Sequence, residues 1–296
     1  MKTEGPVIEI RRLGPFEIRR YSHFAAAVDL TYLAAGTSIA IGAEADGRPA
    51  GLALAHFVRP TAVRVAALTV EEPLRGKGVG SLLSAQLEVE LAARGVILAD
   101  VIAGNPHPFL QRQGWQPGGR LATVYTFSER VGESPWLRSP VNSPSYELFP
   151  WLGHTLADRQ DALRLMESDT VARCLNPFTD PARVYGPCSH GIRHAGELVG
   201  WCVTHRVISG VLHYSSVYVA PRHRRTVAPL IVMGESIREH LRRSEELPTG
   251  VQAVPPELLE IERFASKRLA PWADKIERLH VWWKSFAARK NCGESE

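Results

Sequence analysis

The feature that most constrains this fold is an internal repeat. Six positions in the first half of the chain recur 149 residues later without a gap: Gly42, Gly47, Gly51, His56, Val70 and Arg75 correspond to Gly191, Gly196, Gly200, His205, Val219 and Arg224. Three glycines seldom stay in register by chance, because glycine usually marks a special backbone conformation or a close contact. Further along the register slips by a few residues, and Phe109 and Trp115 correspond to Phe264 and Trp272. The repeat predicts one fold used twice.

A stretch of turn-forming residues separates the two copies. Three Ser-Pro pairs lie close together there: Ser134-Pro135, Ser139-Pro140 and Ser143-Pro144. Such pairs favour turns over helices and strands. We therefore expect domains over residues 1–148 and 149–296, with the boundary near Leu148. A chain of 296 residues, 45% of them hydrophobic, can form a core in each domain.

The first copy has a simple order of expected elements. They are strands over 38–45, 49–58 and 62–70, a helix over 81–94, a strand over 96–103, a short helix over 108–113 and a strand over 121–127. Asp46 and Gly47 suit the tight turn of a hairpin, and Gly95 can end the first helix. This order predicts an α/β fold of the α+β type, in which each of two tandem domains has a mostly antiparallel mixed sheet flanked by helices.

A glycine-rich turn between a strand and a helix carries the clearest chemistry. Gly76, Gly78 and Gly80 alternate there, and without Cβ atoms they let an anion approach the backbone N–H groups at a helix N-terminus. The turn is not a P-loop, because Lys77 is followed by glycine rather than by Ser or Thr. It is not a dinucleotide fingerprint either, because Ser81 stands where that motif needs its third glycine. The alternative is a turn that binds nothing, and the neighbouring arginine argues against it.

This segment resembles the signature of the GNAT superfamily of acyl-CoA-dependent N-acyltransferases, in which Arg75, Gly78 and Gly80 fill the motif positions. The resemblance covers residues 37 to 127 and includes a second motif over 105–115. It implies that the loop amides bind the coenzyme A pyrophosphate, and that the strand before the loop bulges and pairs with the pantetheine arm. The cofactor-binding residues so implied are Leu68, Thr69, Val70, Arg75, Gly76, Lys77, Gly78, Val79, Gly80, Ser81, Asn105 and Phe109.

The function implied by the resemblance is transfer of an acyl group from acetyl-CoA or another acyl-CoA to an amine, which attacks the thioester directly. An N–H group near Val70 would stabilise the oxyanion. The acceptor would be a small molecule or a protein amine. Its identity, the length of the acyl chain and the oligomeric state are left open by the sequence.

Two departures from the family pattern affect the catalytic residues. Leu110 stands where the family usually has the Tyr that protonates the leaving thiolate, and Ala62, Arg64 and Ala66 stand where a Glu or His base is often found. General acid–base help is worth about 10² to 10⁴ in rate, so acyl transfer without it is slower but not forbidden. The departures also allow an alternative, a non-catalytic protein that senses or presents acyl-CoA.

Four side chains are weak candidates to replace the missing groups. Glu71 and Glu72 follow the strand, His107 lies beside the expected thiol end, and His213 lies on the corresponding strand of the second copy. For each of them, an ordinary surface or strand position is the competing interpretation.

The second copy is expected to keep the fold and lose the coenzyme. Arg225, Val227 and Pro229 replace the three loop glycines, and proline has no N–H to offer an anion. We therefore expect a degenerate GNAT-like domain over residues 149–296.

Two other clusters in the second copy admit a functional interpretation. Cys188, His190 and His194 have a spacing that fits no usual zinc site, so no metal is expected. Four consecutive residues, Arg222 to Arg225, form a compact basic cluster before a helix that ends in further arginines. A solvated turn is the plainer interpretation, and a phosphate or acidic-partner site is the alternative.

Charge and composition bound the remaining partners. The net charge of +4 is spread along the chain, so nucleic acid is not expected as a partner. There is no apolar run long enough to cross a membrane and no signal peptide, and the four cysteines form no secreted-type framework. These features favour a cytoplasmic protein.

Overall fold

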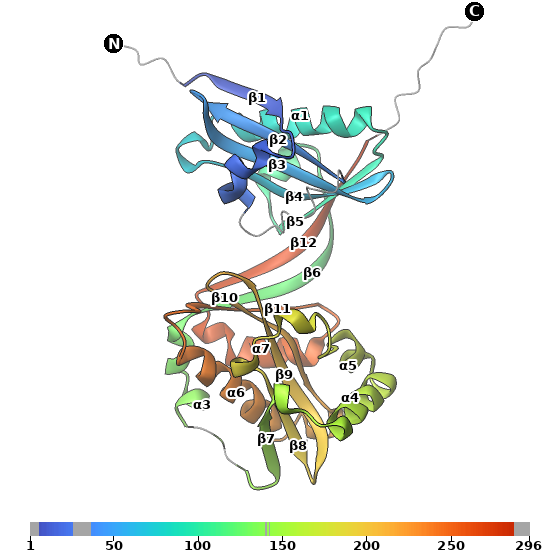
Figure 1. Cartoon of the computed structure of the whole chain (residues 1–296), viewed down its shortest axis with the longest axis vertical. Coiled ribbons are helices and arrows are strands. Elements are labelled where there is room, and N and C mark those ends of the chain that lie inside the picture. The colour runs from blue at the N-terminus through green and yellow to red at the C-terminus, as the bar shows by residue number, and fades with distance from the viewer. Residues whose placement is uncertain (1–5, 26–36, 140, 142, 287–296) are drawn as a thin grey trace, which may run out of the picture. The chain divides into compact units, whose positions relative to one another are not determined.

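The computed structural model describes residues 6–25, 37–139, 141 and 143–286. Contacts divide the chain into two compact units (Figure 1). Unit 1 comprises residues 1–120 and 279–296, and unit 2 comprises residues 121–278. Both are built from a mixed sheet flanked by helices, so the expected fold class is confirmed.

Unit 1 has a sheet with the hydrogen-bonded order β1-β2-β3-β4-β5-β12. Its strands are β1 (Ile8–Arg12), β2 (Ser38–Ala45), β3 (Arg48–Arg59), β4 (Ala62–Val70), β5 (Leu98–Gly104) and part of β12 (Lys275–Ser285). Its helices are α1 (Val79–Ala93) and α2 (Pro108–Arg112), with 3-10 helices over Glu17–Ala25 and Glu72–Leu74. Neighbouring strands are antiparallel except β4 and β5, which run parallel.

Unit 2 repeats this plan with the order β6-β11-β10-β9-β8-β7. Its strands are part of β6 (Gln116–Phe127), β7 (Tyr146–Pro150), β8 (His190–His194), β9 (Glu197–Ile208), β10 (Val211–Val219) and β11 (Thr249–Val254). Its helices are α3 (Pro135–Arg138), α4 (Leu156–Ser168), α5 (Thr170–Cys174), α6 (Ala228–Leu241) and α7 (Leu259–Arg268). Here β10 and β11 are the parallel pair.

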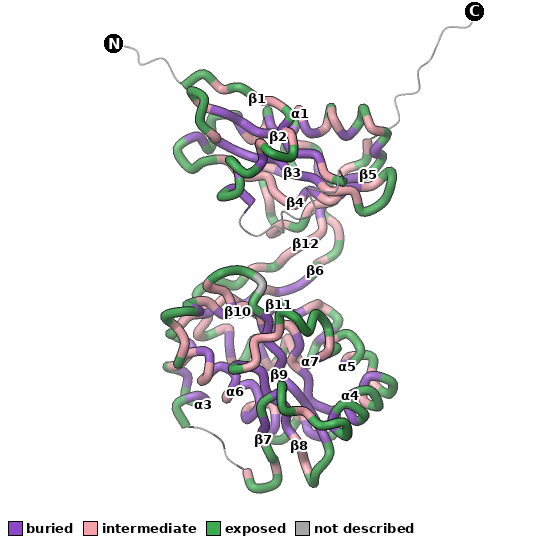
Figure 2. The backbone as a smooth tube through the Cα atoms, viewed as in Figure 1, coloured by how far each residue is buried: buried purple, intermediate pink, exposed green. Residues whose placement is uncertain are grey.

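Local sequence signals account for much of this architecture. Asp46 and Gly47 both have positive φ angles, as a tight hairpin turn requires, and Ala195 and Gly196 repeat the turn in unit 2. Helix α1 ends two residues before Gly95, which has a φ of 71°. Leu83, Leu87 and Leu91, spaced by four on α1, are all buried in the core of unit 1. Figure 2 shows that the inner strands of both units are largely buried.

The repeats and the compact units differ in their last strands. Residues Thr123–Phe127 of β6 pair with β11 in unit 2, although β6 ends the first repeat. Residues Leu279–Ser285 of β12 pair with β5 in unit 1, although β12 ends the second repeat. Each repeat therefore supplies its final strand to the other unit, and the expected boundary near Leu148 does not coincide with the limits of the units. The exchange is possible because equivalent strands offer equivalent backbone hydrogen bonds.

No helix in the described part of the chain is both long and apolar enough to span a membrane.

Candidate acyl-CoA site

The glycine-rich turn of unit 1 has the backbone that its sequence predicts. A 3-10 helix over Glu72–Leu74 leads from β4 into the turn, where Gly76 has a φ of 77° and Gly78 a φ of 88°. Residues other than glycine rarely adopt φ angles in this range. Gly78 is also the residue that precedes the first turn of α1.

The backbone N–H groups of this turn are available to a ligand. Within the described ranges, the N–H groups of Gly78, Val79 and Gly80 donate to no protein acceptor, whereas those of Ser81 and Leu82 bond to the Gly78 carbonyl. Three free donors at the start of a fifteen-residue helix are a suitable arrangement for receiving an anion.

Arg75 borders this site from the strand side. Its side chain is exposed, and its Nε donates to the Val70 carbonyl at 3.0 Å. The rest of its guanidinium makes no ion pair in the described chain, so its charge can contribute to anion binding. Lys77 is exposed next to it.

The strand before the turn separates from its parallel neighbour. β4 has a bulge at Ala66, because Leu54 pairs with Ala67 while Ala55 pairs with Val65. Pairing with β5 ends at Val65. Beyond the bulge, one edge of β4 is therefore without a strand partner, as a ligand arm with amide groups requires.

The residues beyond the bulge are the three for which pantetheine contacts are implied. Leu68, Thr69 and Val70 are all partly exposed. On their other edge they pair with β3, where a Cβ on Gly51 would lie 2.9 Å from the Thr69 carbonyl oxygen. This glycine keeps β3 close to the candidate site.

The two sequence motifs of unit 1 meet at one place. A Cβ added to Gly80 would lie 3.4 Å from Phe109 Cε2 and 3.7 Å from Val70 Cγ2, so the loop, α2 and β4 are in van der Waals range. Ser81 is held by Gln113, whose Nε2 donates to Ser81 Oγ at 3.1 Å. Asn105 is exposed just after β5.

The last strand of the chain adds residues that the sequence did not assign to this site. Trp282 of β12 is fully buried in the core of unit 1 and donates from Nε1 to the Gly104 carbonyl at 3.2 Å. Lys284 donates to Glu88 and to the Gln113 carbonyl, both at 2.7 Å. The sequence carried no signal for these contacts, because a repeat does not indicate that its final strand has been exchanged.

The candidate catalytic residues are dispersed. Glu72 is exposed in the turn that precedes the loop. His107 caps α2 by accepting the Leu110 N–H at 3.3 Å on Nδ1, and its ring lies edge-on to Trp282. His213 belongs to unit 2, where burial lowers its pKa and His205 lowers it further. Leu110 is a buried core residue without a hydroxyl, so α2 offers no proton donor at that position.

The structure also places a carboxylate near β4 that the sequence motifs did not indicate. Asp100 of β5 lies beside Arg64 of β4, which binds it with Nε at 2.6 Å and a terminal nitrogen at 3.0 Å. This hydrogen-bonded pair raises the pKa of Arg64. Val63 and Val65 pack in the core with α1, so Arg64, which alternates with them, faces the other side of the sheet. A single acidic residue in an apolar strand was the available signal for Asp100.

The corresponding turn in unit 2 has lost the anion site. Val227 has a φ of −81°, and the N–H of Ala228 donates to Thr226 Oγ1 at 3.1 Å. Pro229 has no N–H, and the N–H of Leu230 bonds to the Val227 carbonyl at 3.0 Å. Of the three donors that are free in unit 1, only the one at Gly78 has a counterpart without an acceptor among the described residues, the N–H of Val227.

The arginine of the signature has a different role in unit 2. Arg224 still donates from Nε to the carbonyl at the strand end, Val219, at 2.8 Å. Its two terminal nitrogens are bound by Glu260 at 2.6 Å and Asp169 at 2.7 Å. The same residue type that is exposed in unit 1 therefore forms structural ion pairs in unit 2.

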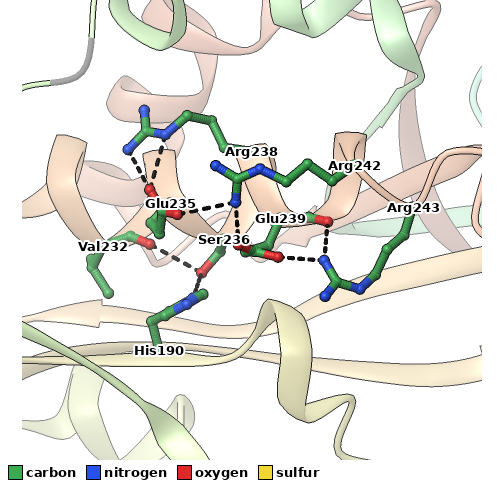
Figure 3. Close-up of polar contacts among 8 residues, drawn as sticks. All are labelled: His190, Val232, Glu235, Ser236, Arg238, Glu239, Arg242 and Arg243. Carbon is green, nitrogen blue, oxygen red and sulfur yellow. Dashed lines mark hydrogen bonds and ion pairs between the residues drawn. The ribbon is translucent and has the colours of Figure 1, made fainter.

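Several other basic residues of unit 2 are paired as well. Figure 3 shows that Arg238 of α6, and Arg242 and Arg243 just after it, bind Glu235 and Glu239 of that helix. Most of these pairs have the three- or four-residue spacing that places opposite charges side by side on a helix. Arg222 binds Glu197 at 3.1 Å. Within the basic cluster, Arg222 and Arg224 are thus engaged in ion pairs, whereas Arg225 forms none with the described residues.

The zinc alternative has no support from geometry. Burial raises the pKa of the Cys188 thiol to about 12, and His190 Nδ1 is hydrogen-bonded to Ser236 at 3.0 Å (Figure 3). Among the described residues, no group of three or more His, Cys, Asp or Glu side chains is placed to hold a metal ion.

Comparison with known proteins agrees with this geometry. Residues 9–115 match the model of the acetyltransferase (GNAT) family. A tandem GNAT protein from the clavulanic acid biosynthesis pathway is 14% identical over 98% of this chain and 100% of its own, with a TM-score of 0.61. A GCN5-related N-acetyltransferase from Sphaerobacter thermophilus is 14% identical over 94% of this chain and 95% of its own, with a TM-score of 0.55.

No curated protein matches the chain. At 14% identity the two solved structures establish a shared fold, and both extend it over nearly the whole chain. The family match covers the segment that holds the glycine-rich turn, the bulged strand and α2. Residues 9–115 therefore match the acetyltransferase (GNAT) family, and the chain as a whole shares the fold of a tandem GNAT protein.

Proposed function

We propose that the protein is an acyl-CoA-dependent N-acyltransferase whose working cofactor site is in unit 1, with acetyl-CoA as the favoured donor. The observation that carries the proposal is the group of three free N–H donors at Gly78, Val79 and Gly80. It stands next to a strand whose edge is open for pairing beyond Ala66. Together they provide a diphosphate site and a site for an amide-containing arm.

In the proposed reaction, an amine attacks the thioester carbon held beside β4. The backbone N–H near Val70 stabilises the oxyanion, and the coenzyme A thiolate then leaves while the amine loses its proton. The thiolate needs no hydroxyl donor at Leu110 to leave. The amine proton goes to Asp100, His107, Glu72 or bulk water, and the structure offers no other carboxylate on the neighbouring strand.

Calorimetric titration with acetyl-CoA and CoA, coupled to an assay of free-thiol release with a panel of amines, tests this function. Gly78→Trp should abolish binding, because the new side chain occupies the space that the diphosphate needs. Gly47→Trp is the matched control, since Gly47 also has a positive φ and open space but lies in a distant hairpin. It should bind as the natural chain does.

The outcomes separate two functions. Binding at one site per chain with amine-dependent thiol release supports the enzyme. Binding without release for any amine supports the sensor, which the buried Leu110 favours. If neither ligand binds, the interpretation of the loop is wrong.

Asp100→Asn tests the proton acceptor. If Asp100 removes the amine proton, its loss should lower the rate of thiol release by about 10² or more. Binding of acetyl-CoA should be unchanged, because the diphosphate site is formed by the loop. A variant with full activity at every pH would assign the proton to water or to another group.

A further inference from the structure

Unit 2 contains a cavity at the place that corresponds to the cofactor site of unit 1. Its volume is about 340 Å³, within the range of small-molecule sites. Val217, Tyr218 and Val219 form one wall, and they are the counterparts of Leu68, Thr69 and Val70, 149 residues earlier. Arg224, Pro229 and Phe264 line it too and correspond to Arg75, Gly80 and Phe109.

The cavity exists because unit 2 has kept the strand geometry of unit 1. β10 carries an extra residue relative to β9 between His213 and Ser216, close to the position of the β4 bulge. Pairing of β10 with β11 ends at His213. Beyond His213, β10 and β11 are no longer paired with each other, just as β4 and β5 are not paired beyond Val65 in unit 1.

A diphosphate does not fit this cavity. The N–H groups at the start of α6 bond to Thr226 Oγ1 and to the Val227 carbonyl, or are absent at Pro229. Arg224 is already bound to Asp169 and Glu260. The ligand must therefore be recognised by other groups than those used for coenzyme A.

The remaining walls are mostly apolar and suit a hydrocarbon portion. Met233 of α6 and Phe264 of α7 line the cavity together with Leu258 and Val217. Burying apolar ligand surface against such side chains contributes about 25 cal/mol per Å².

The unpaired charges of the cavity favour an anion. Arg225 and Arg263 are exposed lining residues that form no ion pair within the described ranges, and Glu257 is the single lining carboxylate there without a partner. Two free guanidinium groups against one free carboxylate attract a negatively charged group, and guanidinium binds carboxylates with two parallel hydrogen bonds.

We propose that unit 2 binds a small organic acid whose apolar tail lies between β10, α6 and α7 and whose carboxylate pairs with Arg225 and Arg263. The site is separate from the acyl-CoA site and needs no phosphate. The second copy has thus kept the separated strands and the cavity beside them, and in it an organic acid takes the place of coenzyme A.

The test uses the full chain and octanoate as the probe, followed by calorimetry. Octanoate should bind saturably at one site per chain, whereas 1-octanol and octylamine should bind at least about tenfold more weakly, because they lack the charge-assisted hydrogen bonds. Met233→Trp should abolish binding by filling the cavity. The double variant Arg225→Gln/Arg263→Gln changes only exposed side chains, and it should weaken octanoate about tenfold or more without changing octanol.

Controls place the ligand in unit 2. Gly78→Trp, which alters only the loop of unit 1, should leave octanoate binding unchanged, and saturating CoA should not displace octanoate. Displacement by CoA, equal binding of octanol, unchanged binding in the double variant, or no saturable binding would each overturn the proposal. Because CoA binding is measured on the same variants, failure of this site is distinguishable from failure of the acyl-CoA site.

Discussion

The loops of the two units show how one backbone plan supports different chemistry. Arg75 and Arg224 occupy equivalent positions and donate to equivalent carbonyls, at 3.0 and 2.8 Å. In unit 1 the helix behind the arginine begins with free N–H groups, whereas in unit 2 the Ala228 N–H is bonded internally, Pro229 has none, and the arginine is bound by two carboxylates. A few substitutions around a retained arginine thus replace free N–H donors by internal hydrogen bonds and an exposed guanidinium by a structural contact.

A second equivalent pair has reversed its charge. Glu44 in unit 1 accepts hydrogen bonds from the Tyr21 hydroxyl at 2.8 Å and from Arg11 at 3.2 Å. Its counterpart, Arg193 in unit 2, binds Asp158 through two nitrogens, both at 2.7 Å. The position keeps an ion pair in both units while its sign changes, so the fold requires a satisfied charge there rather than a particular residue.

The largest expected effect comes from the strand that unit 1 receives from the end of the chain. Trp282→Ala removes a fully buried indole and should destabilise unit 1 by about 3–5 kcal/mol. Hydrogen exchange read by peptide should show opening of β2 to β5, with unit 2 protected.

Trp283→Ala is the matched control on the same strand. Its side chain is 37% exposed, and its loss should have a much smaller effect. If Trp282→Ala opened unit 2 instead, β12 would not be a structural part of unit 1.

The equivalent arginines of the two loops, Arg224 and Arg75, give the next largest effect. Arg224→Ala removes the cation that pairs with Asp169 and Glu260, and should cost unit 2 about 2–3 kcal/mol. Arg75→Ala should leave stability nearly unchanged, because the side chain is exposed, but should weaken CoA. Urea unfolding measures the loss of stability in each variant, and titration with CoA measures the loss of affinity. Equal losses of stability would contradict the contrast between the loops.

Acid should weaken unit 2 through Asp158. Hydrogen bonds from Arg193, with help from Thr155, lower the pKa of Asp158 from 3.8 to about 2. Because the folded-state pKa is the lower one, this stabilisation is present above about pH 4 and is lost as the pH falls towards 2. The shift corresponds to about 2 kcal/mol.

Asp158→Asn should therefore remove about 2 kcal/mol at pH 7 and flatten the acid dependence of unit 2. Unfolding midpoints measured from pH 7 to pH 2.5 provide the check. An unchanged acid dependence in the variant would assign the effect to other carboxylates.

Sequence alone predicted the parts of the structure that depend on local signals. The hairpin at Asp46 and Gly47, the end of α1 before Gly95 and the glycine conformations of the loop each follow from a few neighbouring residues. The repeat predicted that unit 2 would share the fold of unit 1, and the structure confirms it. These features are local, or are copies of local features.

What the sequence did not predict is the choice among equivalent long-range partners. β6 and β12 both end a repeat, and nothing in their residues indicates which sheet each joins. The pairing of Arg64 with Asp100 depends on the register of two parallel strands, and so was missed as well. The same limit applies to the cavity of unit 2, which arises from strand separation rather than from a motif.

The smallest expected effect comes from substitutions in the equivalent hairpin turns, to which the two units should respond alike. Gly47 and Gly196 end equivalent hairpin turns with φ angles of 76° and 83°, and a Cβ at either position meets no atom within 4 Å. Alanine at each should therefore cost only the left-handed backbone strain, about 1 kcal/mol, and should cost both units the same. Hydrogen exchange of β2 and β3 in one variant, and of β8 and β9 in the other, measures the two losses separately. A clear difference between the two losses of stability would show that one hairpin is supported by contacts that the other lacks. The two copies would then share a backbone conformation without sharing local stability.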